Sequence, residues 1–153
     1  MHVLLDTNVL LDSILQRTPW NKEADAVLEA AALKQVTCGA ATLSLATVFY
    51  VARKVVGNAI ARAAVQKCLG AFTILPIDKQ TLLNADAMPG SDFEDNILIA
   101  AAVTASLDAI ITRNVADFSH SPIPAWEPAE LLKRLSGGGA PCFAGGGPAT
   151  PLP

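Results

Sequence analysis

The chain has 153 residues, of which 52% are hydrophobic, and its formal net charge at pH 7 is −3. This length suits one domain with a substantial core and leaves no room for a second domain of similar size. The negative net charge excludes a protein whose whole surface attracts nucleic acid, so any contact with nucleic acid must be local.

The first half of the sequence alternates short apolar runs with helical patterns. Residues 3–5 predict a buried strand, which ends at the carboxylate of Asp6 and is followed by a helical turn. Asn21 can cap a helix with apolar residues at helical spacing, and 36–39 is a candidate second strand. Two helices are then expected over residues 42–55 and 58–69, because Gly57 between them favours a break.

The second half continues the same alternation. Residues 72–77 form a β-branched and aromatic run that predicts a third strand, and Asp78 can cap the helix after it. Residues 92–107 predict a helix that is apolar on nearly every face and is therefore buried against a sheet. A fourth strand is expected over 109–112, a fifth near Ile123, and a last helix from Pro128 to about residue 135.

This order of elements predicts the α/β class, with a mostly parallel sheet of about four to five strands flanked by helices. Ligands of such sheets bind at the carboxyl ends of the strands, which is where Asp6 stands. We expect one domain over residues 1–135. Residues 136–153 are rich in Gly and Pro, and from Gly137 onward they carry no charge, so we expect a disordered tail.

The cysteines, Cys38, Cys68 and Cys142, are widely spaced and odd in number and form no C-x-x-C pair. They indicate neither a disulfide framework nor a zinc site, so a cytoplasmic protein is expected. Asp6 and Asp12 interrupt the apolar N-terminal run, which argues against a secretory signal. The uncharged stretch over 35–52 is interpreted as core, and no contact with a membrane is expected.

Acidic residues stand at three places that a parallel sheet would bring to one edge. Asp6 and Asp117 follow predicted strands, and Asp92 and Asp95 share one face at the start of the buried helix. Clustered carboxylates repel one another unless a cation lies among them. A hard divalent cation such as Mg²⁺ suits oxygen ligands and promotes phosphodiester hydrolysis.

Each of these residues also has a structural interpretation. Ser91 with Glu94 matches an S-x-x-E capping box, and negative charge at Asp92 and Asp95 suits the start of a helix. Asp117 could belong to an ordinary turn, and Asp6 could cap the helix after it. Only the joint placement of the carboxylates favours a functional site.

Four segments in this order, "LLDTNVLLD", "LSLATVFYVARK", "DFEDNILIAAA" and "IITRNVADF…SPIP", together resemble the PIN domain family and its PilT-like branch. The likeness covers Met1 to about residue 135. It implies a three-layer α/β/α sandwich and a ribonuclease that depends on Mg²⁺ or Mn²⁺.

By this resemblance Asp6 and Asp95 match catalytic, metal-binding acids, and Asp117 or Asn114 matches the position after the fourth strand. The usual Glu of the family is replaced by Thr47, which brings a hydroxyl but no charge. We therefore expect Asp92 to stand in for that Glu as a fourth metal ligand. The supporting residues expected around the site are Thr7, Asn8, Thr47, Thr112 and Asn114, and the expected RNA contacts are Arg53, Lys54 and Arg113.

The leading hypothesis is an endoribonuclease that acts as the toxin of a toxin–antitoxin pair, with RNA as substrate, an antitoxin protein as partner and homodimers as a further expectation. The missing Glu motivates an alternative, in which a weak or inactive PIN fold binds RNA or protein. A phosphotransferase of the haloacid dehalogenase type is disfavoured, because its second Asp would in this chain be Asn8, which cannot serve as acid and base.

Overall fold

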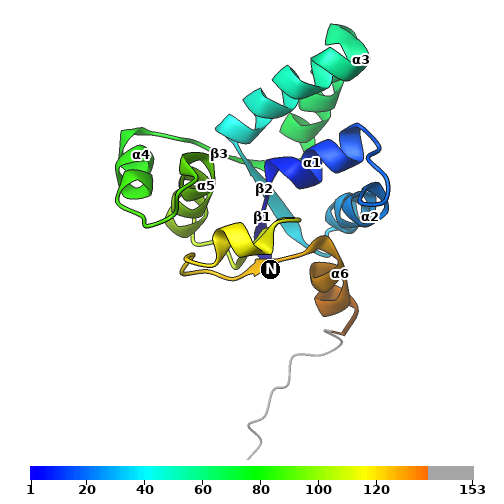
Figure 1. Ribbon diagram of the computed structural model, residues 1–153. Helices are drawn as coiled ribbons and strands as arrows, with labels where there is room; N and C mark the ends of the chain where they lie inside the picture. The colour runs from blue at the N-terminus through cyan, green and yellow to red at the C-terminus, as the bar shows by residue number, and fades with distance from the viewer. Residues whose placement is uncertain (138–153) are drawn as a thin grey trace, which may run out of the picture.

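The computed structural model describes residues 1–137 and contains one five-stranded parallel sheet with the strand order β3-β2-β1-β4-β5 (Figure 1). The elements along the chain are β1 (His2–Leu5), α1 (Thr7–Ile14), α2 (Asn21–Ala32), β2 (Thr37–Ala41), α3 (Thr42–Ala71), β3 (Thr73–Leu75), α4 (Lys79–Asp86), α5 (Phe93–Thr104), β4 (Ala109–Ile111), the 3-10 helix η1 (Val115–Phe118), β5 (Ala125–Trp126) and α6 (Pro128–Gly137).

Helices cover both faces of the sheet, as the alternation of side chains along β1 shows. Val3 and Leu5 belong to a core shared with α1, α2, α3 and α6, whereas Leu4 belongs to a second core shared with α5. Figure 1 shows α4 and α5 on one side of the strands and α1 and α2 on the other. The expected three-layer α/β/α fold with a parallel sheet is confirmed.

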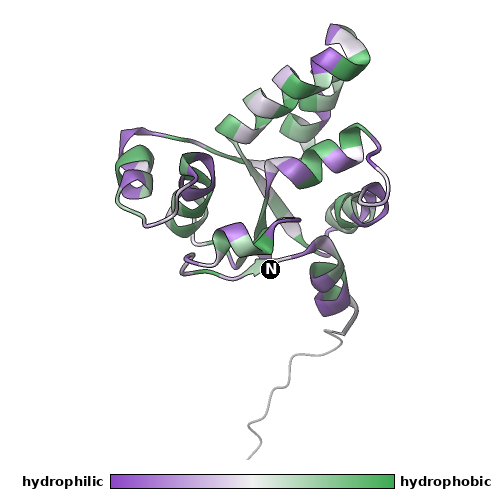
Figure 2. Ribbon diagram, in the orientation of Figure 1, coloured by the Kyte–Doolittle hydropathy of each residue, from purple (hydrophilic) through white to green (hydrophobic). Residues whose placement is uncertain are grey.

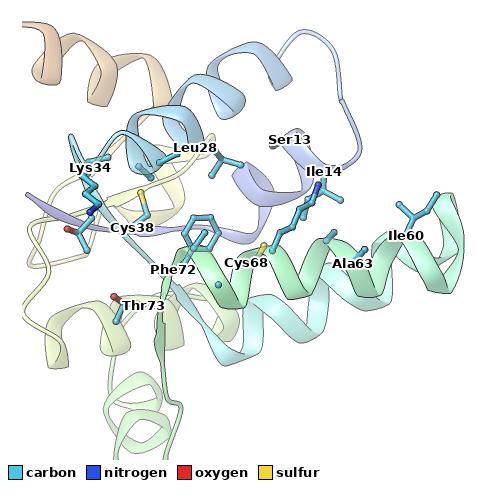
Figure 3. Close-up of a pocket in the computed structure, with 18 residues that line it drawn as sticks. Ser13, Ile14, Leu28, Lys34, Cys38, Ile60, Ala63, Cys68, Phe72 and Thr73 are labelled. Carbon is cyan, nitrogen blue, oxygen red and sulfur yellow. The ribbon is translucent and has the colours of Figure 1, made fainter.

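The predicted break at Gly57 is also confirmed. This glycine has φ 81° and ψ 165°, a backbone conformation that residues with a Cβ atom rarely adopt. It divides α3 into two helical halves, 42–56 and 58–71. The halves run side by side (Figures 1 and 3). As a whole α3 is long and apolar enough to span a membrane by length and composition. Each half, however, is shorter than the roughly 20 residues that a span requires.

Strand and helix ends differ slightly from the sequence expectations. The strand expected over 72–77 is limited to Thr73–Leu75 because Pro76 has no N–H for a sheet hydrogen bond. Asp78 caps α4 as expected, since its Oδ1 accepts a hydrogen bond of 2.8 Å from the Thr81 amide. The last helix continues to Gly137 instead of ending near residue 135. The rest of the segment expected to be disordered lies outside the described residues.

The burial of α5 agrees with its sequence. All side chains from Asn96 to Ala102 are buried, which confirms a helix enclosed on most of its faces. Figure 2 shows that hydrophobic residues also run along α3, and several of them are exposed there: Tyr50, Val55, Ile60 and Leu69. The N-terminal end of the buried α5 lies beside the carboxyl end of β1, and this junction forms the candidate site.

Candidate metal centre

Asp6 is fixed at the junction between β1 and α1. It is 6% exposed, and its Oδ2 accepts hydrogen bonds of 2.7 Å from both the side-chain amide of Asn8 and the hydroxyl of Thr112. Thr112 follows β4, which pairs with β1 in the sheet. The predicted supporting residues Asn8 and Thr112 therefore hold one carboxylate oxygen of Asp6.

A cleft of about 310 Å³ opens beside Asp6. All four carboxylates singled out in the sequence line this cleft: Asp6, Asp92, Asp95 and Asp117. So do four of the five predicted supporting residues, Thr7, Asn8, Thr47 and Asn114. The structure thus brings these residues together, although they come from β1, α1, α3, α5 and the η1 region. Thr112 is not part of the cleft lining, and it contributes by donating a hydrogen bond to Asp6.

The carboxylates that line the cleft concentrate negative charge in a small volume. Burial, followed by the charges of Asp92, Asp6, Asp117 and Glu94, raises the pKa of Asp95 to about 7. Burial also raises the pKa of Asp6, against the lowering effects of Thr112 and the backbone amides of Thr7 and Asn8, and the charge of Glu94 raises it further. A cation in the cleft would relieve this repulsion.

Asp92 has a local role as well, because it is the N-cap of α5. Its Oδ1 accepts hydrogen bonds from the amides of Glu94 at 2.8 Å and Asp95 at 3.2 Å. The Ser91–Glu94 capping box that the sequence pattern suggested is therefore replaced by a cap that starts one residue later. As a consequence, Glu94 lies in the first turn of α5, at the cleft.

The donors around the cleft fit a hard divalent cation. The carboxylates offer oxygen ligands, and Thr7 Oγ1 is a buried oxygen at the cleft that has no hydrogen-bond partner among residues 1–137. Within residues 1–137 no group of three His, Cys, Asp or Glu side chains is close enough to share one ion. The carboxylates would therefore approach one another on binding or act through water, which Mg²⁺ commonly retains.

The three predicted RNA contacts lie outside the cleft lining. Arg53 and Lys54 are exposed on the first half of α3, with their charged groups 4.9 and 4.1 Å from the Tyr50 ring centroid. Arg113 pairs with the buried Asp12 through bonds of 2.8 and 2.9 Å and lies over the Trp20 ring. This pairing ties the segment after β4 to α1.

Replacing Asp12 by Ala is expected to lower the free energy of unfolding by about 2–3 kcal/mol, because it leaves the partly buried Arg113 without its counter-charge. Urea denaturation followed by circular dichroism measures this loss. Asp86→Ala removes an exposed carboxylate elsewhere and is the matched control. Equal stability of the two variants would show that the Asp12–Arg113 pair contributes nothing.

Sequence reasoning assigned no site role to Glu94 or Arg17, which line the cleft, and none to His120. Among the described residues, Arg17 is the only basic side chain in the cleft lining. Asn96, next to Asp95, donates to the Gly90 carbonyl at 2.9 Å and pairs with His120 Nε2 at 2.8 Å, so it joins the loop before α5 to the segment after η1. No sequence pattern marks Arg17 or His120, since both meet their partners only in the fold.

A larger concavity, of about 1000 Å³, lies between α2 and the second half of α3 (Figure 3). Its lining contains no Asp, Glu or His, and burial raises the pKa of the Cys38 thiol there to about 12. A groove without carboxylate or imidazole ligands, and with its Cys38 thiol kept protonated, does not offer the donors of a metal site. Of the two concavities, the acidic cleft is therefore the one that offers the oxygen donors of a metal site.

Comparison with known proteins agrees with this fold. The PIN domain family model matches residues 2–116, and no curated protein matches the chain. A toxin–antitoxin complex from Klebsiella pneumoniae has 26% identity and a TM-score of 0.61, over 82% of this chain and 97% of that chain. DNA-bound VapBC from Salmonella typhimurium has 17% identity and a TM-score of 0.65, over 84% and 98% of the two chains.

A third solved structure is VapC20 of Mycobacterium tuberculosis, described as a sarcin-ricin loop cleaving toxin. It has 12% identity and a TM-score of 0.58, over 71% of this chain and 86% of that chain. The Salmonella and Mycobacterium structures establish similarity of fold, whereas the Klebsiella complex is also similar in sequence at about a quarter of the aligned positions.

Proposed function

We propose that this chain, which belongs to the PIN domain family, is an endoribonuclease that depends on Mg²⁺ or Mn²⁺. The observation that carries the proposal is the cleft that Asp6, Asp95 and Asp117 line, with the pKa of Asp95 raised to about 7. Such a site favours a divalent cation and hydrolysis of a phosphodiester bond.

In the proposed mechanism Asp6, Asp95 and Asp117 hold the cation, with Asp92 beside them. When bound, a divalent cation polarises a phosphoryl oxygen and lowers the pKa of its water. Asn8 and Thr112 keep the Asp6 carboxylate in one orientation, so it need not be ordered on binding. The Thr7 hydroxyl is available to a water or phosphate oxygen, and the half-buried Thr47 hydroxyl, also at the cleft, can orient water.

RNA must approach an acidic cleft, so positive charge is needed at its margin. Arg17 lines the cleft, with its guanidinium 3.8 Å from the Asp12 carboxylate, and is proposed for a phosphate next to the cleaved bond. Arg53 and Lys54 are proposed for phosphates farther along the RNA, since both are exposed. Arg113 has weaker support as an RNA contact because Asp12 already neutralises its charge.

A toxin role with an antitoxin partner is part of the proposal. It is supported by the Klebsiella toxin–antitoxin complex and by the description of VapC20 as a toxin that cleaves the sarcin-ricin loop. We further propose a cytoplasmic protein that forms homodimers, for which the exposed apolar residues of α3 offer surface. Light scattering after gel filtration tests the dimer, and arrest of bacterial growth on induced expression tests the toxin role.

The decisive experiment incubates the purified full chain with labelled RNA in the presence of Mg²⁺, Mn²⁺ or a chelator. Cleavage with either metal and none with the chelator is expected. Saturable Mn²⁺ binding without cleavage of any RNA tested would favour the alternative, a PIN fold that binds RNA or protein without turnover. No cleavage together with no metal binding would remove the nuclease proposal altogether.

A further inference from the structure

The cleft lacks one carboxylate that the family pattern supplies from the helix after the second strand. Thr47 on α3 lies at the cleft at that place, half-buried, and its side chain is neutral. A threonine hydroxyl can accept or donate a hydrogen bond, but it does not offset the charge of a divalent cation. Another residue must supply the missing negative charge if the ion is to be held with comparable affinity.

Two carboxylates on α5 compete for this role, Asp92 and Glu94, and both line the cleft. Asp92 Oδ1 already caps the helix by accepting from the amides of Glu94 and Asp95, so the end of α5 fixes the orientation of this carboxylate. The Glu94 carboxylate makes no hydrogen bond or ion pair found within residues 1–137. It lines the cleft together with Asp6 and Asp95. Its charge raises the pKa of both these acids, whereas the larger effect of the Asp92 charge is on Asp95.

A second feature of the same cleft indicates a bound ligand independently of the acidic cluster. Thr7 follows Asp6 in the chain, lines the cleft and is 7% exposed. Its Oγ1 is buried and has no hydrogen-bond partner in the described part of the chain. A buried hydroxyl without a partner costs free energy unless a ligand or water satisfies it. The cleft therefore contains a polar atom that a metal-bound water can satisfy.

We infer that Glu94, and not Asp92, is the carboxylate that replaces the missing acid of α3 in the divalent-cation site. The inference rests on the proposed function, because it assigns one more residue to the same metal centre. In this arrangement the negative charge is moved from α3 to the first turn of α5. Glu94 then contributes charge directly or by accepting a hydrogen bond from a metal-bound water.

The test measures Mn²⁺ binding to the full chain by isothermal titration calorimetry, with circular dichroism to verify folding. Glu94→Gln is expected to weaken binding about tenfold, in the range found when residues supporting a metal site are removed. Asp92→Asn is expected to weaken it less than about threefold, because Asn retains the helix cap. The double variant with Thr47→Glu and Glu94→Gln is expected to recover most of the lost affinity, since it returns a carboxylate to α3.

Unchanged affinity in Glu94→Gln, or a larger loss in Asp92→Asn, would overturn the inference while leaving the nuclease proposal intact. Failure of the double variant to recover affinity, while it remains folded, would also overturn the inference. Absence of saturable Mn²⁺ binding in the unaltered chain would overturn both. RNA cleavage by the same samples distinguishes failure of the inference from failure of the proposed function. If the unaltered chain binds Mn²⁺ but cleaves no RNA, the nuclease proposal is rejected, while the role of Glu94 in metal binding is retained.

Discussion

Replacing Asp6 by Asn is expected to reduce RNA cleavage by about three orders of magnitude, which corresponds to about 4 kcal/mol of lost transition-state stabilisation. The Asp6 carboxylate lies at the base of the cleft, with one oxygen held by Asn8 and Thr112. Asn removes the charge that a divalent cation requires, and it also presents an amide donor where both neighbours now donate. Metal binding and turnover are therefore expected to fail together.

Initial rates with labelled RNA at saturating Mn²⁺ measure this effect, and calorimetry on the same samples measures metal binding. Asp86→Asn is the control, because it makes the same chemical change at an exposed carboxylate on α4, away from the cleft. Cleavage by Asp6→Asn within tenfold of the unaltered chain would show that the cleft is not the centre of hydrolysis.

The second large effect concerns Asp95, whose raised pKa makes metal binding depend on pH. A cation must displace the proton of a ligand, and the pKa of Asp95 is raised to about 7 by burial and by Asp92, Asp6, Asp117 and Glu94. Mn²⁺ affinity is thus expected to increase about tenfold per pH unit below 7 and to level off above it. Asp95→Asn should weaken this dependence, which then reflects the raised pKa of Asp6 alone, and should leave affinity low at every pH.

Calorimetric titrations between pH 5.5 and about 8.5 would measure this curve. An Mn²⁺ affinity that does not change across this range would show that Asp95 is not a ligand of the cation. Asp86→Asn again serves as the control and is expected to follow the curve of the unaltered chain.

Stability of the metal-free protein should change in the opposite direction. Because folding raises the pKa of Asp95 from 3.8, folding favours the protonated form. The resulting stability is complete below pH 3.8 and is lost as the pH rises to about 7. Asp95→Asn removes this loss, so above pH 7 the variant is expected to be more stable by about 1–2 kcal/mol, after allowance for screening of a partly exposed group.

Much of the fold followed from local patterns. The buried strand before Asp6 and the enclosed helix α5 were predicted from their apolar runs, and the break in α3 from Gly57. These features depend on side-chain periodicity and on backbone freedom within a few residues, which the sequence displays directly. Element ends were less accurate, because they depend on partners such as the neighbouring strand of a ladder.

The candidate site shows the same contrast between features set by local patterns and features set by tertiary contacts. Local sequence patterns were enough to show that carboxylates follow β1 and open α5, since each is next to an element with a strong local pattern. Only the tertiary structure decided that Asp92 is used as a helix cap, that Arg113 is paired with Asp12, and that Glu94 and Arg17 face the cleft. These outcomes depend on contacts between segments distant in the chain and on the rotation of α5 about its axis, which no local pattern specifies.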